Sequence, residues 1–154
     1  AFAAAFVVTI RDFVESPSLR LLDAVSLLLF ALLALVRGFF DPNLSLAAVR
    51  FIAETVLFLA LAVPLAAGRA FSMDYARLDP REAEWPPALF RQVNRRVSAV
   101  WVLAFAAMAA ADAAVTFSPA VPLWSSIAVS IAALGAAITV TLRYPPLAAK
   151  DLNR

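Results

Sequence analysis

Five charged residues lie inside or beside the long apolar runs of this sequence, where an ionised side chain is costly. They are Arg37, Asp41, Arg50, Glu54 and Asp112. Arg50 and Glu54 are four residues apart, so in a helix they share one face and can form an ion pair. We expect the five to form one polar cluster. It could be a proton, ion or substrate site, or an ion-pair network that fixes helix packing. We favour the network, because three of the five lie near the ends of the apolar runs.

A second set of residues recurs at steps of three and four. Its members are Asn94, Ser98, Trp101, Phe105 and Met108, and Asp112 follows at the same spacing. This periodicity places them all on one face of a helix. The face is predicted to be a packing seam between helices. The alternative is a binding face for a lipid, a quinone or a carotenoid.

The sequence contains no cysteine and no histidine. Thiolate chemistry and iron–sulfur ligation are therefore excluded, and the usual zinc and haem ligands are missing. An imidazole general base is excluded as well. No phosphate-binding loop or metal-ligand spacing is present. We expect no catalytic residues, no metal site and no cofactor, and hence a protein that is not an enzyme.

The elements that position these residues are predicted from four apolar blocks. The chain is 64% hydrophobic and 16% charged, and the blocks cover residues 19–40, 44–67, 97–117 and 123–142. Each block is long enough for a transmembrane helix, which needs about 20 residues. The predicted fold is all-α: a polytopic membrane helical bundle of four transmembrane helices. Residues 1–18 are expected to form a partial or interfacial N-terminal helix, because the ten apolar residues at its start reach only about 15 Å.

Prolines and small residues refine these boundaries. Pro87 is well placed to start a helix that continues into the third block, which would give it roughly 30 residues. Pro145 and Pro146 are expected to end the fourth helix and to leave 143–154 as a polar tail. Within the fourth block, Ser126 and Ser130 are four apart. Small residues at that spacing favour close helix packing.

Basic residues predict the orientation of the chain. Eleven of the 13 lysines and arginines fall in the N-terminal segment, the loop 68–96 and the C-terminal end. Cytoplasmic loops carry such an excess, so the central loop and the C-terminus are expected in the cytoplasm and the protein in the bacterial inner membrane. The net charge is only +2. Because the arginines flank apolar blocks, no binding to nucleic acid is expected.

Residues 71–77 and the aromatic and polar residues that follow them form a longer pattern. It continues with Trp85, Phe90, Asn94, Arg95, Trp101, Phe105 and Asp112. This pattern resembles a family of small uncharacterised bacterial inner-membrane proteins. The part over 94–105 is also similar to a helix of the intracellular septation protein A family. That family has five spans, and four are clear here. The resemblance implies a non-enzymatic membrane protein of envelope biology, and it transfers no catalytic residues.

Two functions are compatible with these features. The first is an accessory or assembly subunit of a larger membrane complex, indicated by the short chain and the missing catalytic side chains. The second is a small oligomeric transporter or channel protomer that uses Arg50, Glu54 and Asp112. The expected partners are the lipid bilayer and either other membrane subunits or further copies of the chain.

Overall fold

The computed structural model describes residues 21–40, 43–76 and 85–150. The chain divides into two compact units, Ala1–Leu44 and Ser45–Arg154. Throughout the described residues the regular structure is helical, and no strand occurs among them. The all-α prediction is therefore confirmed.

The described residues of the first unit form one apolar helix. Helix α2 covers Leu21–Leu35 and continues directly into a π-helical segment, η1, over Val36–Phe40. The apolar part Val25–Phe39 is shorter than the other candidate spans. The helix predicted for the first block is confirmed over 21–40, whereas a membrane crossing by it stays a prediction. The expected helix in residues 1–18 lies outside the described residues.

Helix α3, Leu46–Ala66, opens the second unit. The hydroxyl of Ser45 caps it by accepting a hydrogen bond from the Ala48 amide at 3.1 Å, which satisfies one of the free donors of the first turn. At the other end the chain turns at Gly68, whose φ of 82° suits glycine. The amide of Arg69 then donates to the Pro64 carbonyl at 2.8 Å.

Helix α6 is the longest element. It covers Pro87–Phe117, 31 residues, with proline at its first position, so the start predicted from Pro87 is confirmed. At 1.5 Å per residue it is roughly 46 Å long, against about 30 Å for the hydrocarbon core of a bilayer. Its polar first turns therefore extend beyond the core. A short helix, α4 over Ser72–Ala76, precedes it.

Helix α7 covers Leu123–Lys150 and includes Pro145 and Pro146. The expectation that these prolines end the helix was wrong. Each proline removes one backbone donor and its ring crowds the carbonyl four residues before it, which weakens the last turns of the helix without ending it here. The segment is also held by side chains, because Arg96 of α6 donates to the Tyr144 hydroxyl at 2.6 Å.

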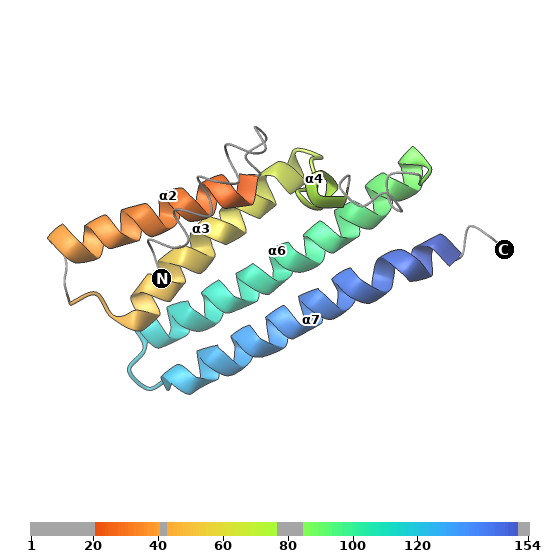
Figure 1. The fold of residues 1–154 in the computed structure, drawn as a ribbon. Helices are drawn as coiled ribbons and strands as arrows, with labels where there is room; N and C mark the ends of the chain where they lie inside the picture. The colour runs from red at the N-terminus through yellow and green to blue at the C-terminus, as the bar shows by residue number, and fades with distance from the viewer. Residues whose placement is uncertain (1–20, 41–42, 77–84, 151–154) are drawn as a thin grey trace. The chain divides into compact units, whose positions relative to one another are not determined.

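In the second unit, α6 lies between α3 and α7 (Figure 1). Its buried side chains are small or medium-sized, among them Val93, Val97, Ala104, Met108 and Ala109. Small side chains let helix backbones approach closely, which is the usual basis of helix packing in lipid. Among the residues that the structure describes, three helices are long and apolar enough to span a membrane: Leu46–Ala66, Pro87–Phe117 and Leu123–Ala148. The chain is an all-helical, multi-pass membrane protein.

Candidate functional site: a polar cluster within the membrane helices

Arg50 joins three helices through one guanidinium group. Its Nε donates to Asp112 Oδ2 of α6 at 2.9 Å. Its Nη2 donates to the Ser130 hydroxyl of α7 at 2.7 Å. Arg50 itself is one turn inside α3. A planar guanidinium with several fixed donors can make such bonds in two directions at once.

Glu54 is the fourth member of the cluster. It lies one turn after Arg50 on the same face of α3, and its Oε1 is 3.6 Å from Arg50 Nη2. Both carboxyl groups therefore contact the same guanidinium. The sequence-based expectation of an ion pair at this spacing is confirmed.

The cluster is largely shielded from its surroundings. The side chain of Asp112 is fully buried, that of Glu54 is 9% exposed, and that of Arg50 is 25% exposed. Burial of an unpaired charge in apolar surroundings is very costly. The arginine therefore stabilises the carboxyl groups, and the three helices are held in register by the same contacts.

Charge and hydrogen bonding in the cluster are not fully balanced. One guanidinium faces two carboxyl groups, so one negative charge is left over when both are ionised. Asp112 Oδ1 and Glu54 Oε2 are buried without a hydrogen-bond partner, as are the hydroxyls of Thr55 and Thr116. Buried polar atoms normally have partners. These oxygens could accept a proton, a water molecule or a small cation.

Among the described residues, no three His, Cys, Asp or Glu side chains come together in a way that could hold a metal ion. The cluster contains only two carboxyl groups. Its oxygen atoms would suit a hard cation only with help from hydroxyl groups or water.

Three of the five predicted charged residues come together in this cluster. Arg37 lies in η1 of the first unit and is exposed. Asp41 lies outside the described residues. Ser130 is a member that sequence reasoning missed. The sequence signal for it is a hydroxyl inside an apolar run, which by its spacing alone indicates only a small residue for close packing.

The predicted face of α6 makes contacts with three other helices. Ser98 Oγ accepts a hydrogen bond from the Ser72 amide at 3.3 Å and lies 3.0 Å from the Ser72 hydroxyl of α4. Trp101 Nε1 donates to the Thr141 hydroxyl of α7 at 3.0 Å. Asp112 meets α3, as described above. The side chains of Ser98, Trp101 and Asp112 on this face therefore serve contacts between helices.

The other residues of this face make contacts within α6 or are buried against its neighbours. Asn94 is buried, and its side chain donates to the Phe90 carbonyl at 2.9 Å. Met108 is also buried, while the rings of Trp101 and Phe105 lie 6.1 Å apart at an angle of 32°. Occupation of this face by a lipid, quinone or carotenoid stays a prediction.

No known protein family, no curated protein and no solved structure matches the chain. The resemblance to the intracellular septation protein A family stays a prediction. The fold and the cluster together define the chain as a multi-pass helical membrane protein with a buried ionic cluster between its spans.

Proposed function

We propose that the chain is a non-catalytic accessory subunit of a larger complex in the bacterial inner membrane. One observation carries this proposal: α3, α6 and α7 form a single layer, and only 17–22% of the most apolar 18-residue stretch of each span is buried within the chain. A single layer of helices does not enclose a pathway by itself. It does offer broad apolar faces to other membrane helices.

The ionic cluster supports this proposal by giving the layer a fixed geometry. Arg50 of α3 bonds to Asp112 of α6 and to Ser130 of α7, so both of these helices are tied to the same guanidinium. Transmembrane helices without such polar bonds between them associate mainly through van der Waals packing. A subunit that presents a surface to partners benefits from a fixed arrangement of its helices.

The orientation is part of the proposal. By the positive-inside rule, the basic residues of the segment 68–96 and of the C-terminal end support a cytoplasmic position for both parts. The resemblance described above adds envelope biology as the setting in which such a complex would act.

Photocrosslinking in the native membrane tests the subunit proposal. A photoreactive phenylalanine analogue replaces one exposed apolar residue of each span in turn: Leu59 of α3, Leu103 of α6 and Ile131 of α7. We expect irradiation to link at least one position to a discrete second protein, which mass spectrometry then identifies. Samples kept in the dark are the control. If all three positions crosslink to lipid alone, the proposal is wrong.

A second candidate function is favoured by the unpartnered carboxylate oxygens of Glu54 and Asp112. Exchangeable protons or small cations at such atoms are typical of transport pathways in membrane proteins. Because one layer of helices encloses no pathway, this function requires several copies of the chain. Crosslinked dimers or higher multimers of the chain, without a second protein, would support it.

Flux measurements separate the two functions. Proteoliposomes carry the wild-type protein, Asp112→Asn, Glu54→Gln or the control Ser126→Ala, whose hydroxyl donates only to the Leu123 carbonyl of its own helix. A transporter loses proton or cation flux in both carboxyl variants and keeps it in the control. If the wild-type protein carries no flux, the transport function is rejected.

A further inference from the structure

A pocket of about 530 Å³ opens at the end of the second unit where α6 begins. It is lined by the chain that follows α3, by α4 and by the first turns of α6. The lining residues are Gly68, Ala70, Met73, Arg91, Gln92, Arg95, Arg96 and Ala99. Its volume lies in the usual range for small-molecule sites in proteins.

The pocket is strongly basic. Arg91, Arg95 and Arg96 contribute three guanidinium groups, and the described part of its lining contains no carboxyl group. Arg96 is held by Tyr144, since its guanidinium also lies 5.6 Å from the centre of that ring. Arg91 and Arg95 form no ion pair with any residue that the structure describes.

The spacing of these arginines favours a bound anion. Arg91 and Arg95 are four residues apart on one face of α6, where two like charges repel each other. An anion between them would remove this repulsion. Guanidinium groups bind phosphate through paired N–H donors, which makes arginine the usual residue for phosphate recognition.

The position of the pocket along α6 indicates which class of molecule would supply the anionic group. The arginines occupy the polar first turns of α6, and the apolar part of the helix begins directly after them, at Val97. The lining also includes apolar side chains, because Ala70 is buried and Met73 and Ala99 are partly buried. The pocket therefore lies where the polar and apolar parts of the helix meet, at the level of lipid headgroups.

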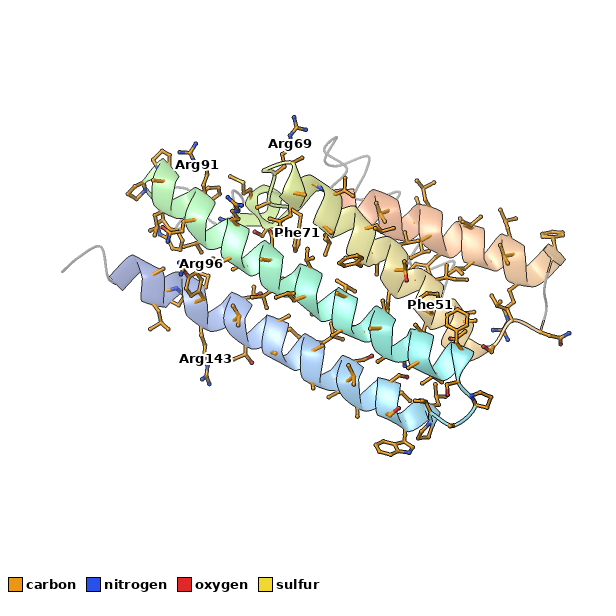
Figure 2. The ribbon with its side chains drawn as sticks, turned by 180° about the vertical axis from the view of Figure 1, so that it is seen from behind. Phe51, Arg69, Phe71, Arg91, Arg96 and Arg143 are labelled. Carbon is orange, nitrogen blue, oxygen red and sulfur yellow. The ribbon has the colours of Figure 1, made fainter. Side chains whose placement is uncertain are left out.

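Figure 2 shows Arg91 at the end of α6 and Arg96 further along the same helix, on the side of α7. Arg69 and Arg143 lie at the same end of the unit. Neither is among the residues that line the pocket. These two exposed arginines offer a matched control with the same change of net charge.

We propose that this pocket binds the phosphate group of an anionic phospholipid. Arg91 and Arg95 bind the phosphate oxygens, while Arg96, anchored by Tyr144, forms the wall toward α7. The apolar lining contacts the glycerol and the first part of an acyl chain. The inference is independent of the two functions proposed above, since it concerns a different part of the protein.

Lipid binding by native mass spectrometry tests the proposal. The full chain is stripped of lipid in mild detergent and titrated with phosphatidylglycerol, with phosphatidylcholine or with inorganic phosphate. The variants are Arg91→Gln/Arg95→Gln and the control Arg69→Gln/Arg143→Gln. Neither pair touches the contact between Arg96 and Tyr144, and circular dichroism establishes that both variants are folded.

The expected result is preferential retention of phosphatidylglycerol over phosphatidylcholine by the wild-type protein. Each arginine near a charged membrane surface contributes roughly fivefold to such binding, so the double pocket variant is expected to bind roughly 25-fold more weakly. The control variant keeps most of the affinity. Three results would each overturn the proposal: equal binding of the two lipids, equal losses in both variants, or inorganic phosphate binding as tightly as the anionic lipid.

Discussion

Arg50 Nε and Asp112 Oδ2 lie 2.9 Å apart although 62 residues separate them in the chain. This contact joins α3 to α6, which are both long and apolar enough to span a membrane. The arginine side chain is one-quarter exposed, whereas the aspartate is fully buried. The aspartate consequently depends on the arginine far more than the arginine depends on the aspartate, since Arg50 also contacts Glu54 and Ser130.

Replacement of Asp112 by asparagine is expected to destabilise the protein. The variant keeps the shape of the side chain but removes its charge, so Arg50 loses its closest ionic partner while Glu54 still balances its charge. The cost is therefore that of a hydrogen bond to a charged group, about 1.5–3 kcal/mol. Reversible unfolding in mixed detergent micelles measures this loss. A loss below about 1 kcal/mol would contradict the role we give to this contact.

Ser130→Ala is expected to cost less, about 0.6 kcal/mol and at most about 1.7 kcal/mol, which is the range for hydrogen bonds between membrane helices. The variant removes the acceptor that links Arg50 to α7. Ser126→Ala is the matched control, because that hydroxyl donates only within α7. The same unfolding measurement applies. Equal losses in both variants would show that the link to α7 contributes nothing.

Two glycine-to-alanine substitutions are expected to have opposite effects. Gly68 has a φ of 82°, and an added Cβ at either Gly68 or Gly135 meets no atom within 4 Å. The effects therefore come from the backbone. Gly68→Ala forces an unfavourable conformation, at roughly 1–2 kcal/mol. Gly135→Ala, inside α7, should stabilise by about 0.5–1 kcal/mol. Melting temperatures that move in the same direction would refute this explanation.

Ser98→Ala is expected to loosen the attachment of α4 to α6. The variant removes the oxygen that accepts from the Ser72 amide, and a buried donor without a partner costs about 1–3 kcal/mol. We expect faster cleavage by trypsin after Arg69, which is exposed. Ser125→Ala serves as the comparison, since that side chain donates to the Pro122 carbonyl in the turn before α7. An unchanged cleavage rate would argue against the anchoring role of Ser98.

The proposed orientation predicts which thiols a membrane-impermeant maleimide can reach. The chain has no cysteine, so each introduced cysteine is its sole thiol. Ala120→Cys lies in the exposed turn between α6 and α7, and Ala88→Cys lies at the exposed start of α6. We expect labelling of position 120 in intact spheroplasts and of position 88 only after the membrane is opened. The reverse pattern would invert the topology.

Much of the fold follows from local sequence. Apolar blocks of about 20 residues can satisfy their backbone groups in lipid only as helices, so the three long spans were predictable. Proline at the first position likewise defined the start of α6. The end of α7 was not predictable from Pro145, because the contact between Arg96 and Tyr144 comes from another helix.

The candidate site was predictable only in part, for the same reason. The pair Arg50 and Glu54 follows from helical spacing alone. The choice of Asp112 and Ser130 as further partners depends on how α6 and α7 pack against α3, which no local pattern specifies. The role of Ser72 as the partner of Ser98 had no recognisable signal, since it lies in a polar stretch with other small residues.

The spacing of Arg50 and Glu54 has a consequence for how the protein is made. Arg50 leaves the ribosome 62 residues before Asp112, which at ordinary rates of synthesis is roughly 3–12 s. During that interval α6 and its carboxyl group do not yet exist. The carboxyl group of Glu54, within α3 itself, is the ionic partner that Arg50 already has. Neutralisation of Arg50 by Glu54 within α3 lets this helix enter the bilayer first. The guanidinium forms its contacts with Asp112 and Ser130 after α6 and α7 have been synthesised.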